Sequence, residues 1–454
     1  MEKNTKRNTF SGGLGFVLAA AGSAVGLGNI WRFPYLAAKY GGGIFLLVYI
    51  LLVITLGYTL MIAENAIGRR TGKSSLDAFA ALNKKWGWLG IIATLIPCII
   101  LPYYNVIGSW VVKYFVAYLD GQATAIAGGT YFTDMLASPG TLILYQTIFT
   151  GSTMLVLLNG VQKGVEKTST ILMPILILLA IVISVYSLFQ PGAIEGIKYL
   201  FIPKFENFSI NSILAALGQM FYSLSLAMGI MIAYGSYLPK NADLNKSVGQ
   251  IEIFDTIVAI LASTMVVPSV FAFSGGDQSA LQAGPSLMFI TLPKVFESMG
   301  MSNIVGGLFF FLVFAAALTS SISIMETIVA CICDHFKVER SKAILIVGIT
   351  SWCVGLLPLL GYNLLSWVKF FGRFDILDFM DFITNSVLMP VCALLTCIFV
   401  SVGIGVNVIG EEVLSSGKFG RQKLFNVMIK YIAPVLLVAI LVSSLLISMG
   451  IISL

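Results

Sequence analysis

Eleven long apolar stretches without a single charged residue constrain this 454-residue chain more than any other feature. Each is at least 20 residues long, and about 20 apolar residues are enough to cross a bilayer as a helix. Charged residues make up 11% of the chain, whereas soluble domains carry roughly 25%. The sequence therefore predicts an all-α membrane protein with eleven transmembrane helices. The stretches are 11–31, 40–63, 86–112, 135–162, 168–194, 207–239, 256–276, 298–325, 343–368, 382–410 and 431–454.

The composition also argues against several classes of chemistry. The chain has one histidine, His335, so no histidine cluster can hold a metal. The six cysteines lack metal-knuckle spacing and lie in or beside apolar stretches, as buried free thiols do. No nucleophile–base pair is evident, so we expect no enzyme. The net charge of +6 comes from loop lysines and arginines, and we expect no nucleic-acid partner.

Lys and Arg accumulate in cytoplasmic loops, which gives the orientation. With the N-terminus inside, 19 of these residues fall on the inner side and 8 on the outer side. We therefore expect a multi-pass protein of a bacterial-type inner (plasma) membrane, with the N-terminus cytoplasmic and the C-terminus outside. The whole chain, 1–454, reads as a single transmembrane domain within the lipid bilayer. Outer segment 276–297 is semi-polar and interrupted by proline, which predicts a re-entrant helical lid.

Two of the stretches carry polar and helix-breaking residues near mid-membrane. The first contains Gly22, Gly26 and Gly28 together with Asn29, and stretch 207–239 contains a similar polar cluster between Gly218 and Gly229. Unpaired backbone is tolerated in a membrane only where it lines a cavity. Matching interruptions five helices apart indicate an inverted-repeat transporter. Close helix packing through small residues is the alternative, but it does not explain Asn29.

Two further features indicate cation ligands. Ala316, Thr319 and Ser320 are spaced by three and four residues, so they share a helical face and offer oxygen ligands suited to a small alkali cation. The alternative is that the two hydroxyls bond back to their own helix. Asp255, at the start of stretch 256–276, is either part of a site or extends its side chain to the membrane interface.

Several segments resemble the neurotransmitter:sodium symporter family across essentially the whole chain. AAAGSAVGLGNIWRFPYLAAKYGGGIF is similar to the first-helix signature of the family, and GQMFYSLSLAMG, LTSSISIME and KGVEK are similar to other family segments. The eleven helices resemble the shorter bacterial members. The resemblance implies a 5+5 inverted-repeat fold in which helices 1 and 6 are broken. Its first repeat would cover about 10–195, its second about 205–405, and an extra helix about 424–450.

The resemblance also implies the site. A first sodium ion would be held by Ala24, Asn29, Ser223, Asp255 and the substrate carboxylate, and a second by Gly22, Val25, Ala316, Thr319 and Ser320. Arg32 and Asp381 would form an outer gate, with Asp378 as the competing partner, and Arg7 and Asp334 an inner gate. Substrate would contact Ser23, Ala24, Gly26, Gly28, Ile100, Tyr104, Tyr222, Ser223, Ser225, Met228, Ser320 and Ile324.

This chain departs from the family pattern at several positions. Phe10 replaces a tryptophan at the inner gate, and Ala227 replaces a glycine in the second break, which leaves the extent of unwinding there open. Asp255 falls where chloride-dependent members carry an asparagine, and Ala259 where they carry a chloride-binding serine. A fixed carboxylate can supply the negative charge of chloride, so we expect no chloride requirement.

The function expected from these features is sodium-coupled symport of amino acids, by alternating access, with Na⁺ at two sites. Monoamine-transporting relatives carry an aspartate at the position of Gly26, so its absence here favours a free amino acid. The apolar and aromatic pocket residues favour a hydrophobic or aromatic side chain. The alternative is a non-transporting amino-acid sensor or ligand-gated channel on the same scaffold.

Overall fold

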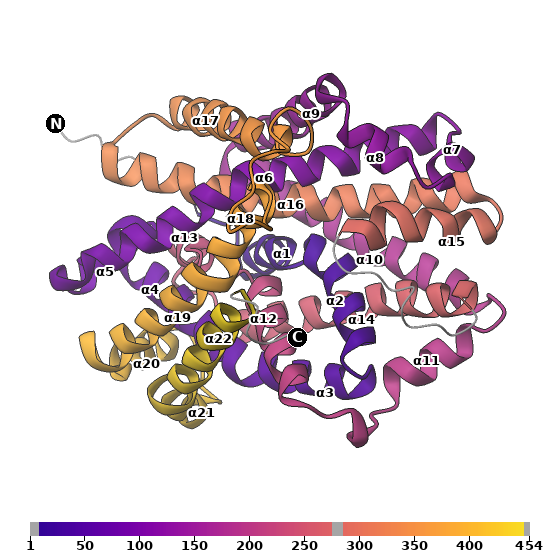
Figure 1. The fold of residues 1–454 in the computed structure, drawn as a ribbon. Coiled ribbons are helices and arrows are strands. Elements are labelled where there is room, and N and C mark those ends of the chain that lie inside the picture. Colours follow the sequence, from indigo (N-terminus) through magenta and orange to yellow (C-terminus); the bar gives the residue numbers. More distant parts are fainter. Residues whose placement is uncertain (1–8, 275–284, 449–454) are drawn as a thin grey trace.

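The structure is a computed structural model that describes residues 9–274 and 285–448. In the first half, the helices are α1 (Gly13–Ala24), α2 (Phe33–Lys39), α3 (Gly43–Leu52), α4 (Tyr58–Thr71), α5 (Ser75–Leu82), α6 (Gly87–Leu119), α7 (Ala123–Ala127), α8 (Tyr131–Leu136), α9 (Pro139–Leu158), α10 (Lys167–Leu188) and α11 (Ala193–Phe201). In the second half, they are α12 (Ile210–Ser223), α13 (Ile230–Tyr237), α14 (Leu244–Ser274), α15 (Leu292–Ser298), α16 (Ser302–Phe336), α17 (Arg340–Leu360), α18 (Ile376–Asp381), α19 (Met389–Ile398), α20 (Val406–Leu414), α21 (Gln422–Val427) and α22 (Ala433–Ser448). Figure 1 shows these helices as one bundle.

Short π-helical segments join several of these helices into longer spans. They are η1 (Gly28–Arg32), η2 (Val53–Gly57), η4 (Val161–Glu166), η7 (Leu287–Thr291), η8 (Phe382–Leu388), η9 (Phe399–Gly403) and η10 (Met428–Ile432). Such segments are frequent at functional sites, because the extra residue in the turn redirects the side chains that follow.

The described parts of the eleven predicted stretches are mainly helical. Within the described residues, nine continuous spans are long and apolar enough to cross a membrane, and α1 with the helix from Gly28 to Lys39 makes a tenth that bends by 56°. The remaining stretch, 207–239, forms the two shorter helices α12 and α13. The prediction of an all-helical membrane protein is confirmed.

The first break follows Ala24. Val25 leaves the helical region with φ −77° and ψ 94°, and helical structure resumes before Gly28. Asn29 partly replaces the lost helical bonding, because its Oδ1 accepts a hydrogen bond of 3.2 Å from the N–H of Gly26. The predicted interruption of this helix is therefore observed. The side chain of Asn29 pairs with the backbone N–H of Gly26.

The second break covers residues 224–229 between α12 and α13. Ser225, Ala227 and Gly229 adopt left-handed φ angles of 52°, 61° and 74°. Alanine at position 227 therefore does not prevent unwinding, although a side chain in this region costs about 1–3 kcal/mol. Part of that cost is offset by Glu64 of α4, whose Oε1 accepts a 2.7 Å hydrogen bond from the Ala227 N–H.

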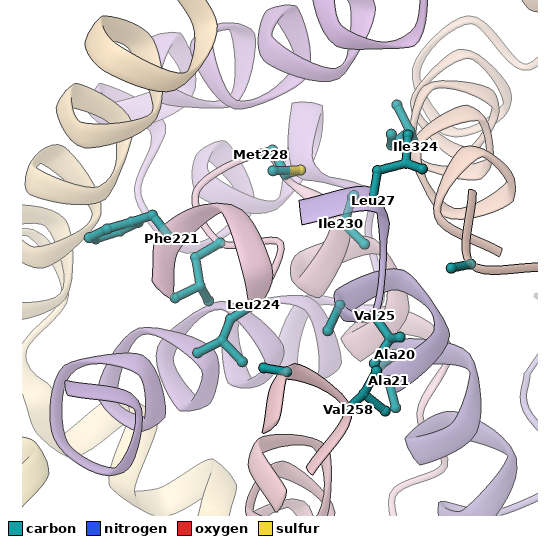
Figure 2. Packing of buried hydrophobic residues seen from close by; sticks show 14 of the residues in the cluster. Ala20, Ala21, Val25, Leu27, Phe221, Leu224, Met228, Ile230, Val258 and Ile324 are labelled. Carbon is teal, nitrogen blue, oxygen red and sulfur yellow. The ribbon is translucent and has the colours of Figure 1, made fainter. Parts of the chain in front are cut away.

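The core surrounds these two breaks. Figure 2 shows Val25 and Leu27 of the first break and Leu224 and Met228 of the second, with Val258 of α14 and Ile324 of α16. Helix α16 is buried along most of its length, including every residue from Ala315 to Cys331. The unwound segments are thus enclosed by packed helices, as the membrane environment requires of irregular backbone.

The predicted lid at 276–297 is described only in part. Residues 275–284 lie outside the described residues, but η7 and α15 are helical and bury Leu287, Phe289 and Phe296. The Phe289 ring stacks on Phe132 of α8 at 5.1 Å. The helical character of the second half of this segment agrees with the prediction.

Close packing of α4 against α13 generates a testable prediction. A Cβ added at Gly68 would lie 1.9 Å from the Ile232 carbonyl oxygen, so Gly68→Ala must separate these helices. We expect it to destabilise the protein by about 1–3 kcal/mol, the usual cost of overpacking. Gly151→Ala is the control, because a Cβ there meets no atom within 4 Å. Thermal unfolding in detergent measures both, and equal midpoints would contradict this packing.

Candidate functional site

A small cavity of about 30 Å³ lies between the two helix breaks. Eleven of the twelve residues predicted to contact substrate line it, and Ser223 does not. Leu27 and Asn29 are additional lining residues that the prediction of substrate contacts did not include. The structure therefore brings the predicted residues together, while their contact with substrate stays a prediction. The lining consists of Ser23, Ala24, Gly26, Leu27, Gly28, Asn29, Ile100, Tyr104, Tyr222, Ser225, Met228, Ser320 and Ile324.

One end of the cavity is polar. The Ser23 carbonyl oxygen accepts hydrogen bonds of 3.1 Å from both Ser225 and Ser320. A Cβ at Gly26 would lie 2.8 Å from Ser320 Oγ and 3.4 Å from the Tyr104 hydroxyl, so only glycine leaves this end open. The buried Tyr104 hydroxyl has no hydrogen-bond partner among the described residues. Such a donor is costly to leave unpaired, so it marks a place for a polar ligand group.

The other side of the cavity is apolar. Ile100 of α6, Met228 of the second break and Ile324 of α16 are each at most 4% exposed. The Tyr222 ring closes against Gly28, where a Cβ would lie 2.4 Å from the ring. An elongated ligand with a charged end and an apolar end matches this division.

Asp255 lies at the centre of a buried oxygen cluster beside this cavity. Its Oδ1 accepts hydrogen bonds from Ser223 Oγ at 2.7 Å and Asn29 Nδ2 at 2.8 Å, and its Oδ2 accepts one from the Tyr49 hydroxyl at 2.7 Å. Asp255 is fully buried and lies inside α14, eleven residues after Leu244. The alternative of a side chain extended to the membrane interface is therefore wrong.

The chemistry of this cluster fits a sodium ion. Carboxylate, hydroxyl and amide oxygens are hard ligands, as small alkali and alkaline-earth cations prefer. The Asn29 amide presents its Nδ2 to Asp255, so a cation there requires the amide to turn and present Oδ1. The described residues contain no group of three His, Cys, Asp or Glu side chains that could bind a transition metal.

The second predicted ion site lies between α1 and α16. Ser320 Oγ contacts the Gly22 carbonyl oxygen at 3.5 Å, and a Cβ at Gly22 would lie 3.3 Å from Thr319 Cβ. The Thr319 hydroxyl bonds to the Ala315 and Ala316 carbonyl oxygens of its own helix, at 3.0 and 3.1 Å. The self-bonding alternative thus describes Thr319 in this structure, whereas Ser320 bonds across to α1. Val25, another predicted ligand, is the first residue of the break that follows α1.

A larger cavity of about 460 Å³ lies beyond Tyr222. Arg32, Asp378 and Asp381 all line it, as predicted for an outer gate. Within the part of the chain that the structure describes, Arg32 forms no ion pair, and its guanidinium lies 5.4 Å from the centre of the Tyr222 ring. Asp381 accepts hydrogen bonds from Tyr103 at 3.3 Å and Asn385 at 2.5 Å. The choice between Asp378 and Asp381 stays a prediction.

On the opposite side, the predicted inner gate is only partly described. Arg7 lies outside the described residues, and Asp334 Oδ2 accepts a 2.8 Å hydrogen bond from the Ser74 N–H. The Phe10 ring packs edge-on against Phe16, Tyr234 and Tyr237 at 5.6–6.0 Å. The tryptophan expected by resemblance is thus replaced by a purely apolar contact.

The comparisons with known proteins decide the family. A model described as the sodium:neurotransmitter symporter family matches residues 7–128 and 126–451. The chain belongs to this family. The sodium:neurotransmitter symporters are sodium-dependent transporters, not enzymes, so the chain is a multi-pass membrane transporter.

Individual relatives agree with this assignment. The sodium-dependent transporter YhdH of Bacillus subtilis (strain 168) is 37% identical, with 94% of this chain and 95% of the relative covered. A sodium-dependent transporter of Haemophilus influenzae is 33% identical, with 97% and 99% covered. The crystal structure of MhsT in complex with L-phenylalanine is 35% identical, with 96% of this chain and 100% of that chain covered and a TM-score of 0.87.

Sequence reasoning missed several buried carboxylates of this symporter, among them Glu64 and Glu326. Glu64 binds the second break, and Glu326 of α16 accepts 2.8 Å from the Tyr237 hydroxyl and forms an ion pair of 2.6 Å with Arg340. Each follows directly on an uncharged stretch, 40–63 or 298–325, and so marked the expected end of a span. The helices continue past both residues, to Thr71 and Phe336.

The second ion site yields a prediction. If Thr319 and Ser320 are ion ligands as predicted, Thr319→Ala and Ser320→Ala should each remove one oxygen ligand. An unsatisfied partner in a buried site costs about 1–3 kcal/mol, or roughly 5–150-fold in sodium affinity. Thr327→Ala is the control, because that hydroxyl bonds only to the Ser323 carbonyl oxygen of its own helix. Substrate uptake titrated with sodium measures all three variants. A double variant with unchanged sodium dependence would exclude these hydroxyls as ligands.

Proposed function

We propose that this protein is a sodium-coupled symporter of free amino acids with hydrophobic or aromatic side chains. The observation that carries the proposal is the cavity between the two helix breaks, polar at Ser23, Ser225 and Ser320 and apolar at Ile100, Met228 and Ile324. Helix N-termini at such breaks bind anionic groups, and freed carbonyls bind cations. A zwitterion with an apolar side chain uses both ends of the cavity.

Two sodium ions couple to this substrate in the proposal. Ala24, Asn29, Ser223 and Asp255 hold the first, together with the substrate carboxylate, so each ligand increases the affinity for the other. Gly22, Val25, Ala316, Thr319 and Ser320 hold the second. The unpaired Tyr104 hydroxyl donates to the substrate carboxylate, which lies beside Gly26 because no side chain occupies that space.

The solved relative supports the class of side chain. MhsT, which is similar over 96% of this chain, was crystallised with L-phenylalanine. The cavity here is narrow, at about 30 Å³, so we expect its walls to move when such a side chain binds. Met228 is suited to this movement, because methionine is unbranched and adapts to irregular spaces. Tyr222 and Tyr104 then close over the substrate.

Alternating access proceeds by rocking of helices 1, 2, 6 and 7 against the rest of the bundle. Arg32 pairs with Asp381 to close the outer side, and Arg7 pairs with Asp334 to close the inner side. The cavity of about 460 Å³ around Arg32 supports an arrangement in which the outer gate is not paired. The inner side faces the cytoplasm, as the distribution of Lys and Arg indicates.

The experiment for this function is sodium-driven uptake into proteoliposomes. We expect radiolabelled phenylalanine or leucine to accumulate only with a sodium gradient, and other hydrophobic amino acids to compete. Gly26→Asp should abolish this uptake, because a carboxylate there repels the substrate carboxylate and a Cβ already lies 2.8 Å from Ser320 Oγ. Gly26→Ala separates the steric effect from the charge. Competition by monoamines and by no amino acid would refute the proposal.

Transport is proposed to be independent of chloride. Asp255 and Ala259 are both fully buried and lie one turn apart on α14, so the fixed carboxylate occupies the region where a chloride would otherwise compensate sodium. An uncompensated ion at low dielectric is very costly, so one of the two anions must be present.

Replacing chloride by gluconate tests this compensation directly. Wild-type uptake should not change. Asp255→Asn should lose uptake, and Asp255→Asn with Ala259→Ser should regain it only when chloride is supplied. Wild-type protein that stops transporting in gluconate would overturn the compensation argument.

A further inference from the structure

The loop at 361–375, which joins α17 to α18, has a defined structure. Phe370 and Phe374 exchange backbone hydrogen bonds of 2.8 and 3.0 Å. Asn363 Nδ2 donates to the Leu136 carbonyl oxygen of α8 at 2.9 Å, which ties the loop to its neighbour. Its side chains are therefore held in fixed directions.

The loop has one packed edge and one exposed apolar edge. Phe370 stacks on Phe379 of α18 at 4.0 Å, and Phe374 stacks on Phe382 of η8 at 5.3 Å. On the other edge, Leu364, Trp367 and Phe371 are 68%, 77% and 78% exposed. Three large apolar side chains that are this exposed on one ordered loop indicate a contact surface for another molecule or for the membrane.

Phe371 shows that this presentation is costly. Its φ of 50° lies in the left-handed region, which costs a bulky residue about 1–3 kcal/mol. Its ring lies 6.0 Å from the Phe379 ring of α18 and is still 78% exposed. Strained backbone persists where the presented group has a use.

The charges of the loop identify the kind of partner. Residues 361–375 contain two exposed cations, Lys369 and Arg373, and one carboxylate, Asp375, whose Oδ1 accepts a 2.8 Å hydrogen bond from the Asp378 N–H of α18. The loop connects the ends of two spans, Arg340–Leu360 and Ile376–Gly403, so it lies at a face of the membrane. Tryptophan and other aromatic rings concentrate at the bilayer interface, and basic residues there attract anionic headgroups.

We propose that this loop is an interfacial anchor that inserts Leu364, Trp367 and Phe371 into the bilayer surface and binds anionic phospholipid headgroups through Lys369. The anchor is continuous with the outer cavity, because Arg373 and Phe374 line that cavity together with Arg32 and Asp381. Lipid bound by the loop therefore holds α18, which carries Asp378 and Asp381, at a fixed depth. The inference does not depend on which amino acid is transported.

The test measures the environment of Trp367 in nanodiscs. The contribution of Trp367 is obtained by subtracting the fluorescence of Trp367→Phe from that of the wild-type protein. The same subtraction with Trp110→Phe gives the contribution of a fully buried indole as a control. The nanodiscs contain phosphatidylcholine with bromine near the headgroup or deep in the chain, with and without phosphatidylglycerol. We expect shallow bromine to quench the Trp367 component, and aqueous iodide not to reach it. Leu364→Trp in the Trp367→Phe background should restore a component with the same quenching.

The charge arm of the test uses a titration with phosphatidylglycerol. Lys369→Gln should weaken the apparent affinity for this lipid about fivefold, since one basic residue near the surface contributes about 1 kcal/mol. Lys418→Gln, an exposed lysine in the loop before α21, should leave the response of Trp367 unchanged. A Trp367 component quenched by iodide and not by bromolipid would overturn the anchor. Shielding that appears only with a protein dimer would assign the loop to contact between two copies instead.

Discussion

The structure depends on one constraint: inside a membrane, every backbone donor and acceptor freed by a broken helix must find another partner. Two such breaks face each other at the centre of the protein, and polar side chains complete both. Asn29 satisfies the N–H of Gly26, Glu64 satisfies the N–H of Ala227, and Ser225 and Ser320 donate to the carbonyl oxygen of Ser23. Of these groups, Asn29, Ser225 and Ser320 also line the cavity between the breaks, so the same side chains complete the backbone and shape the cavity.

The second break is held open against local preference. Ser225 and Ala227 both adopt left-handed φ angles without being glycine, so the unwound state stores strain. Glu64 Oε1 of the neighbouring helix α4 accepts a 2.7 Å hydrogen bond from the Ala227 N–H, so the donor that this conformation exposes has a partner. The hydrogen bond to Glu64 therefore offsets part of the strain at Ala227. This chain thus adopts the left-handed conformation at position 227 without the glycine of the family pattern.

Much of this arrangement could be predicted from the sequence. The eleven spans follow from charge-free length, and the two breaks follow from Gly22, Gly26 and Gly28 and from the polar run before Gly229. The position of three carboxylates inside the spans, not at their ends, could not be predicted. Asp255, Glu64 and Glu326 each border an uncharged stretch, and all three prove to be inside long helices. By composition alone, a charged residue marks the end of a predicted span. A carboxylate can nevertheless lie inside a span when groups elsewhere in the fold donate hydrogen bonds to it. Those donors lie up to 226 residues away along the chain, so the local sequence does not reveal them.

Consecutive residues of α16 point to different neighbours. Ser320 bonds to the carbonyl oxygens of α1, whereas Ser321 bonds to Asn105 of α6 at 3.2 Å and lies 3.1 Å from Thr153 of α9. Rotating α16 to release one contact would therefore break the other. Helix α16 is thus held by hydrogen bonds on two sides, so a displacement that separates Ser320 from α1 and keeps the contacts of Ser321 requires α1 to move. If the proposed second sodium ion binds at Thr319 and Ser320, movement of α1 away from α16 would remove its α1 ligands, so ion release and the movement of α1 would be a single event.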